Sequence, residues 1–224
     1  RGIVIQRFKY SESSIIAKIY TLQFGLCSFL VQGARKKTSP AKANLLQPLS
    51  LIELVAYHKE TSALQKVKEL KNEFPLHSLQ NNISKTAIAL FLSEMLARSI
   101  REETPNIRLF EFLHHSIRLL DSIENPSSFH LVFLVKLTKF LGFFPQGEFS
   151  ERNSFFNLRE GLFERAKPNH PYFLPPELSG IFFQLICHEI EDACNFSMRG
   201  HHRKALLEKI IEYYRLHLTG IQEI

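Results

Sequence analysis

The sequence predicts an α+β protein in which a small N-terminal β-barrel is followed by an all-helical C-terminal domain. Residues 1–74 consist of short runs rich in Ile, Val, Tyr and Phe, whereas from Ser84 the apolar residues recur with a helical period. Residues 1–44 hold eight Lys or Arg against one acid, and the rest of the chain holds 20 against 21. We therefore expect one domain over residues 1–78 and a second over residues 79–224.

The predicted barrel has five strands separated by turn-forming residues. Ser11–Ser13 interrupt the first two runs, and Gly25 precedes the third. The fourth run contains Pro48, which fits a strand that enters at an edge or a bulge. Because the OB-fold is a five-stranded barrel that commonly holds nucleic acid, we predict an OB-fold. The expected strands are Gly2–Phe8, Ser14–Leu22, Cys27–Gln32, Leu45–Tyr57 and Gln65–Lys71.

The helical domain is predicted from periodicity and from capping residues. Ser127 is placed to cap one helix, and Gly142 is placed to end it. Residues 144–176 hold five of the ten prolines, so this segment is predicted to be a loop-rich insert. The expected helices are Ser84–Arg101, Pro105–Asn125, Ser127–Leu141, Pro176–Phe196 and His202–Leu218.

The cysteines and the hydropathy pattern indicate the cellular compartment of the protein. Three cysteines without framework spacing favour a reducing environment. Two of them, Cys187 and Cys194, are seven residues apart on one predicted helix, the spacing of a buried stripe. No run of about 18 residues is apolar and free of charge, and Arg1–Tyr10 lacks the apolar core of a signal peptide. We expect a cytoplasmic protein with no membrane span.

A basic loop is the leading candidate for a binding site. Arg35, Lys36 and Lys37 are consecutive and follow the third predicted strand, so their long side chains can reach the phosphates of a polyanion. The alternative is a loop that is merely solvated. The full set of cations predicted to contact nucleic acid is Arg7, Lys9, Lys18, Arg35, Lys36, Lys37 and Lys42.

Aromatic residues near these cations are candidates for stacking on bases. Phe8, Tyr10 and Tyr20 lie on or next to predicted strands, and a stacked base contributes about 1–3 kcal/mol. The alternative is that their rings fill the barrel.

Motifs for enzymatic chemistry are missing from the sequence. It has no G-x-S-x-G, Walker or G-x-G-x-x-G motif. His188-Glu189 lacks the second His of a zincin, because Asp192 stands four positions after His188. The two members of each adjacent pair, His114-His115 and His201-His202, point in different directions on a helix, and both pairs are expected to be surface or cap residues. We predict a protein that is not an enzyme and needs no cofactor.

Short motifs follow one another in a characteristic order along residues 2–143. They are Gly2-Ile3-Val4, Tyr10 to Ile16, Thr21, Gly25, Gly33-Ala34-Arg35-Lys36, Leu46-Gln47-Pro48-Leu49, Glu53-Leu54, Ser93 to Leu96, Glu103 to Asn106, Leu109-Phe110, Phe133 to Leu137 and Leu141-Gly142-Phe143. In this order and spacing the chain resembles the RecO family of bacterial DNA repair proteins, which are recombination mediators.

The resemblance implies an OB-fold, a helical C-terminal domain and no enzymatic turnover. It also implies binding of single- and double-stranded DNA, annealing of complementary strands, contact with the acidic C-terminal tail of single-stranded DNA-binding protein, and loading of RecA together with RecR. Such a protein works in the cytoplasm, associated with the nucleoid. Many members carry a four-cysteine zinc site, but residues 144–180 contain no cysteine, so zinc is not expected. Apolar packing should hold this segment, through Phe149, Phe155, Phe156, Leu158, Leu162, Phe163, Tyr172 and Phe173.

A second site is expected to receive the tail peptide, which needs an apolar groove with a basic rim. The alternative is that Lys136 and Lys139 only extend from a buried helix toward water. The predicted groove consists of Arg118, Phe133, Lys136, Leu137, Lys139 and Phe140. The alternative function for the whole chain is a non-enzymatic interaction scaffold whose basic arm contacts acidic protein surfaces.

Overall fold

Two compact units, Arg1–Ser122 and Ile123–Ile224, make up the chain. The predicted boundary near residue 78 stays a prediction. The computed structural model describes residues 1–34, 40–57, 59, 61–101 and 104–219.

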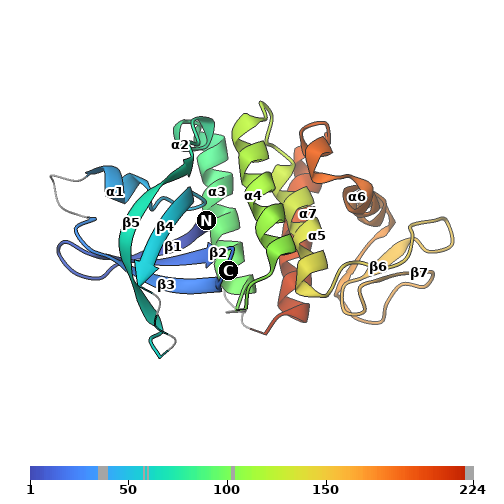
Figure 1. Ribbon diagram of the computed structural model, residues 1–224. Helices are drawn as coiled ribbons and strands as arrows, with labels where there is room; N and C mark the ends of the chain where they lie inside the picture. Colours follow the sequence, from blue (N-terminus) through green and yellow to red (C-terminus); the bar gives the residue numbers. More distant parts are fainter. Residues whose placement is uncertain (35–39, 58, 60, 102–103, 220–224) are drawn as a thin grey trace. The chain divides into compact units, whose positions relative to one another are not determined.

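Five strands close into a barrel in the N-terminal unit, which confirms the predicted architecture (Figure 1). The order around the barrel is β1-β2-β3-β5-β4. Strands β3 and β5 are parallel, and the other neighbours are antiparallel. The strands are β1 Gly2–Lys9, β2 Ile15–Thr21, β3 Gly25–Val31, β4 Leu51–Tyr57 and β5 Leu64–Phe74.

Alternate residues of each strand fill the barrel interior. In β2, Ile15, Ala17 and Ile19 are buried in one cluster with residues of the other strands. Because successive side chains of a strand point to opposite faces, Ile16 and Lys18 lie on the outer wall. The sequence alternation therefore decides which residues a ligand can reach.

The fourth strand begins later than predicted, at Leu51 rather than Leu45. Residues Pro40–Asn44 form the short helix α1, and Leu49 has a φ of 62°, a left-handed conformation that does not occur within a strand. Leu49 N–H donates to Val4 O at 2.7 Å, so this turn is attached to β1. The left-handed turn, rather than Pro48 alone, sets the start of the strand.

Helices α2 Ser78–Asn81, α3 Ile83–Ser99 and α4 Ile107–Ser122 complete the N-terminal unit. Helix α3 lies against β1, where Ser93 Oγ donates to Ile5 O. Helix α4 covers Tyr20 on the outer wall, and the rings of Tyr20 and Phe110 are stacked with their centroids 6.4 Å apart. Tyr20 is only 1% exposed, so it is not available for base stacking.

A polar cluster fastens α2 to α3 and α4. The Asp121 carboxylate accepts hydrogen bonds from three successive backbone N–H groups at the start of α2. Buried Lys85 donates to Ser78 Oγ and to the Asp121 carbonyl, each at 2.7 Å. A buried charge is tolerated only with such partners, so the cluster fixes the three helices to one another.

The C-terminal unit is mostly helical, but the proline-rich segment holds a small sheet of order β7-β6-β8. The prediction of a loop-rich insert therefore missed three short strands. They were too short to leave a pattern in the sequence. The elements are α5 Phe129–Leu141, β6 Phe155–Asn157, β7 Leu162–Glu164, β8 Phe173–Leu174, α6 Pro176–Cys187, the 3-10 helix η1 Ile190–Cys194 and α7 Gly200–His217.

Aromatic rings hold this segment in place, as predicted. Phe156 is fully buried, and its ring centroid lies 4.9 Å from that of Phe163, 4.7 Å from that of Phe182 and 5.7 Å from that of Tyr213. Leu162 departs from the prediction, because it is 42% exposed. The insert, which contains no cysteine, thus has an apolar core.

The expected helix Pro176–Phe196 is broken at His188, where the backbone is extended. Cys187 is therefore the last residue of α6 and is exposed, so the prediction that it is buried in a core stripe was wrong. The stripe assumed one continuous helix, and the break at His188 changes the direction of the residues that follow.

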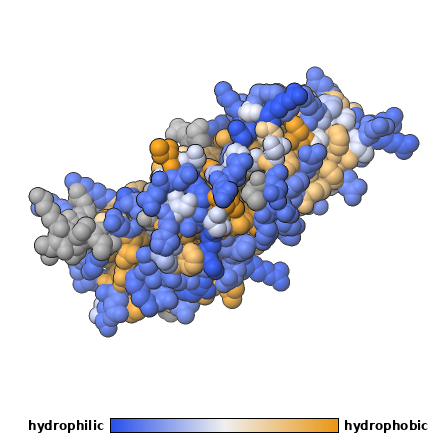
Figure 2. All heavy atoms as spheres, turned by 90° about the horizontal axis from the view of Figure 1, so that it is seen from above, coloured by the Kyte–Doolittle hydropathy of each residue, from blue (hydrophilic) through white to orange (hydrophobic). Residues whose placement is uncertain are grey.

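The surface is largely hydrophilic on the face seen in Figure 2, with scattered hydrophobic patches. Among the helices that the structure describes, none combines the length and the apolar character needed to cross a bilayer.

Candidate nucleic-acid interface

Three of the predicted cations gather at one end of the barrel. The register pairs Arg7 with Ala17 and Lys9 with Ile15, so both cations continue the interior-facing side of β1 beyond the core. Arg7 Nη1 donates to Ala43 O in α1 at 3.1 Å, which brings α1 and its exposed Lys42 to the same end. We call Arg7, Lys9 and Lys42 the barrel-end cations.

The barrel-end cations are exposed, and none forms an ion pair with a residue that the structure describes. Their charge is therefore available to an anionic ligand. Lys18 is separate from them, because it lies on the outer wall between Gln6 and Ser28 of the neighbouring strands. Arg35, Lys36 and Lys37 lie outside the described residues, so their predicted role stays a prediction.

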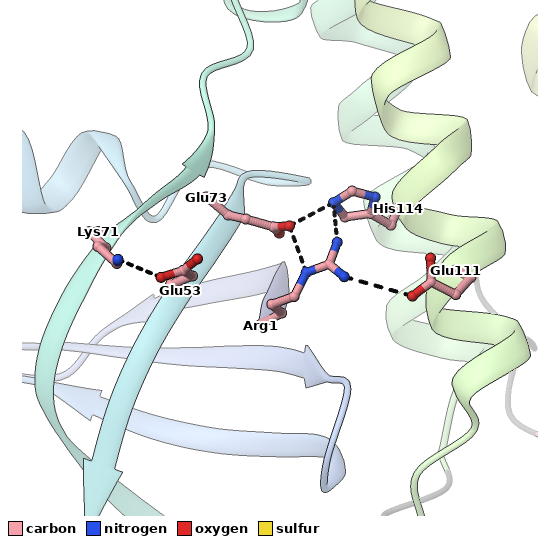
Figure 3. A network of polar contacts seen from close by, with 6 residues as sticks. All are labelled: Arg1, Glu53, Lys71, Glu73, Glu111 and His114. Atoms are coloured by element: carbon pink, nitrogen blue, oxygen red, sulfur yellow. Dashed lines mark hydrogen bonds and ion pairs between the residues drawn. The ribbon is translucent and has the colours of Figure 1, made fainter.

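Arg1, another N-terminal cation, serves a network between β5 and α4 (Figure 3). Its Nε lies 2.6 Å from Glu73 Oε1, and its Nη2 lies 2.9 Å from His114 Nε2. Glu111 Oε1 lies 3.8 Å from Nη1. The guanidinium is thus surrounded by protein acceptors and is not free to bind phosphate.

His114 was expected to be a surface or cap residue, and that expectation was wrong. It is 6% exposed and stacks on Phe110, one helical turn earlier. Burial lowers the pKa of His114 below its ordinary value and so favours the neutral ring, whose unprotonated Nε2 can accept the hydrogen bond from Arg1 Nη2. The four-residue spacing from Phe110 was the signal in the sequence that it shares the buried face.

A surface ion pair beside this network joins Lys71 to Glu53. Lys71 Nζ lies 2.6 Å from Glu53 Oε2, and both side chains are largely exposed. The hydrogen bond between them lowers the pKa of Glu53 and raises the pKa of Lys71. Because water screens such a pair, it contributes little to stability, but it leaves Lys71 partly neutralised.

The residues of the predicted peptide groove are divided between the two structural units. In the N-terminal unit, the Arg118 guanidinium lies over the Phe74 ring at 4.5 Å. In the C-terminal unit, Phe133 and Leu137 are buried in α5, and Lys136 Nζ donates to Ile186 O at 3.1 Å. Glu189 lies 3.5 Å from the same Nζ, so Lys136 has a structural role. Lys139 is exposed, and Phe140 is half-buried.

A groove of about 400 Å³ adjoins Lys139 in the C-terminal unit. Phe143, Phe144, Tyr213 and His217 contribute its aromatic lining. The sequence reasoning did not find this groove, because α5 and α7 bring residues together that are about 70 positions apart along the chain, as in the hydrogen bond from Tyr213 to Phe143 O.

The described residues include no group of three or more His, Cys, Asp or Glu placed to hold a metal ion. The insert has no cysteine and is filled with aromatic rings, so it does not fit the zinc site of many relatives.

Two family models match nearly the whole chain. The family model for the N-terminal part of recombination protein O matches residues 1–73, and the model for its C-terminal part matches residues 80–222. DNA repair protein RecO from Phocaeicola vulgatus is 39% identical over 218 residues, covering 97% of this chain and 90% of the relative.

Two further relatives also match over nearly their whole length. The RecO protein of Bacteroides fragilis is 39% identical over 97% of this chain and 90% of its own length. That of Azobacteroides pseudotrichonymphae is 33% identical over 100% of this chain and 93% of its own length. The chain belongs to the RecO family of DNA repair proteins.

Proposed function

We propose that this chain is a recombination mediator that binds single- and double-stranded DNA and promotes annealing of complementary strands. With RecR, it helps to load RecA on DNA coated by single-stranded DNA-binding protein. Membership of the RecO family, joined to exposed barrel-end cations on a closed barrel, carries the proposal. The protein acts in the cytoplasm, associated with the nucleoid.

Annealing on this surface needs no chemical step. Two DNA strands repel each other through their phosphates, and the barrel-end cations together with the basic loop reduce that repulsion. Strands held on one protein are then close enough to pair. Catalysis is not required, because base pairing itself stabilises the annealed duplex.

Removing the three charges of the basic loop should weaken the dependence of DNA affinity on salt. If four to six cations engage single-stranded DNA, the log–log slope is roughly −3 to −4. Replacing Arg35, Lys36 and Lys37 by Ala should make the slope less negative by about 2, because each lost phosphate contact removes about 0.7. Fluorescence anisotropy of a labelled oligonucleotide between low and moderate salt measures both slope and affinity.

A matched control removes three exposed cations, Arg152, Arg165 and Lys204, from the C-terminal unit. It changes net charge equally and should keep the wild-type slope. Equal slopes for all three proteins would remove the loop from the DNA site. An annealing assay with complementary oligonucleotides tests the scaffold alternative, because a scaffold that contacts only acidic proteins leaves the annealing rate unchanged.

The tail of single-stranded DNA-binding protein would dock in the C-terminal unit beside Lys139. Its terminal carboxylate needs a cation, and its aromatic side chain needs a groove such as the one lined by Phe143 and Phe144. Lys139→Glu should weaken binding of a fluorescent tail peptide about tenfold or more. Lys204→Glu makes the same charge change on an exposed position of α7 and should bind normally. Unchanged binding by Lys139→Glu would exclude this groove.

A further inference from the structure

Helix α3 carries apolar side chains on two faces, and one of these faces is open to solvent. Leu92 and Leu96 are buried in the N-terminal unit. On the other face, Ile83 is 89% exposed, Leu90 is 54% exposed, and Ala87 between them is also exposed. Positions i, i+4 and i+7 of a helix lie on the same side, so these three residues form a continuous apolar strip. We call Ile83, Ala87 and Leu90 the α3 face.

An uncharged groove of about 320 Å³ adjoins the α3 face. Leu90 and Pro48 contribute apolar walls, and the amides of Asn44, Gln47 and Asn81 contribute polar groups. No Lys, Arg, Asp or Glu is among the described residues that line it. DNA and acidic peptides need cations, so this groove suits neither of them. Amides both donate and accept hydrogen bonds, so a surface of this kind can pair with its own copy.

The α3 face is self-complementary when two copies of the helix pack antiparallel. With a two-fold axis between Thr86 and Ala87, Ile83 of each copy lies opposite Leu90 of the other. Thr86 then lies opposite Ala87, and these small side chains let the two helices approach closely. Glu94, one turn beyond Leu90, is the next charged residue on this side of α3. At a rise of about 1.5 Å per residue, its two copies are roughly 22 Å apart along the axis, so the pairing brings no like charges together.

We infer that the α3 face is the contact surface between two copies of this chain. Three side chains and the rim of the groove make a contact smaller than the about 800 Å² per partner of a stable interface, so the dimer is weak and forms where copies are concentrated. Copies bound to the same DNA are concentrated in this way. The dimer then joins two sets of barrel-end cations, and each copy can hold one strand. This last role rests on the proposed function, whereas dimerisation itself does not.

Charged residues at opposite positions test the antiparallel pairing without DNA. Ile83→Lys and Leu90→Glu should each weaken dimerisation about tenfold or more, because a charge then faces an apolar side chain of the other copy. The double variant should dimerise more strongly than either single variant, since each new cation faces a new carboxylate. Ile107→Lys, at a position of α4 that is 64% exposed, is the matched control and should behave as wild type. Sedimentation equilibrium at protein concentrations up to about 1 mM measures the dissociation constant, because a weak dimer is populated there.

A cysteine beside the two-fold axis tests the geometry of the contact. Ala87→Cys places the thiols of the two copies next to each other, so mild oxidation should produce a covalent dimer on a non-reducing gel. Ile107→Cys is the matched control, and wild type shows the background from its own exposed Cys187. Both should give far less covalent dimer than Ala87→Cys. Circular dichroism of every variant confirms that the fold is retained.

The outcomes separate the inference from the proposed function. A wild-type protein that stays monomeric at every concentration overturns the inference, and the α3 face then belongs to a partner of another kind. Dimerisation that is unchanged by Ile83→Lys and Leu90→Glu also overturns it, as does a double variant no stronger than the single ones. If wild type dimerises as expected but binds neither form of DNA, the proposed function fails and the dimer contact stands.

Discussion

Replacing Phe156 by Ala should lower the free energy of unfolding by about 3–5 kcal/mol, the range for deleting a fully buried aromatic side chain. Phe156 is 0% exposed and touches three other rings of the C-terminal unit. The cavity cannot close easily, because the rings around it belong to β7, α6 and α7. Urea unfolding followed by circular dichroism measures the loss.

Leu162→Ala is the matched control for this variant. Leu162 lies on β7, is 42% exposed, and pairs with Asn157 next to Phe156. Its truncation should change stability by about 0.5 kcal/mol or less, as for most surface substitutions. A small effect of Phe156→Ala, comparable with that of Leu162→Ala, would mean that the insert is not held by its aromatic core.

Acidification should destabilise the protein through His130 of α5. Burial, together with the nearby Arg203 charge, lowers the pKa of His130 to about 4 from 6.5. The unfolded chain therefore binds the proton first as pH falls, and stability is lost between about pH 6.5 and pH 4. At pH 5 the loss due to this one group should be about 2 kcal/mol relative to pH 8.

Urea unfolding of wild type and His130→Gln at pH 8 and pH 5 isolates this effect. Other groups titrate equally in the two proteins, so the difference between their pH dependences belongs to His130. We expect His130→Gln to lose less stability on acidification than wild type, by about 2 kcal/mol. Parallel pH dependences would show that the His130 pKa is not lowered in the folded state.

Most of the fold was predictable, because its elements carry strong local patterns. The alternation in Ile15–Ile19 marked a barrel strand, and Gly142, whose φ is 86°, ended α5 where a glycine cap was expected. Prediction failed where a local pattern was short or was interrupted. The three strands of the insert have at most three residues each. Between Gly180 and the break at His188, helix α6 contains no Gly or Pro that would signal the end of the helix.

The candidate site was predictable only in part. Net charge pointed to the N-terminal segment, and Arg7, Lys9 and Lys42 do meet at one end of the barrel. The net charge of this segment includes Arg1, and the predicted set of DNA-contacting cations includes Lys18. Arg1 instead joins buried His114 and Glu73, and Lys18 lies on the outer wall.

By itself, the sequence determined the α+β class, the number of barrel strands and the family, because these depend on periodicities and motifs that neighbouring residues carry. Only the tertiary structure decided which side chains share a surface. Leu30 and Lys66 are far apart along the chain, and strand register alone places them side by side. Register is fixed by the packing of the whole barrel, which no local segment encodes.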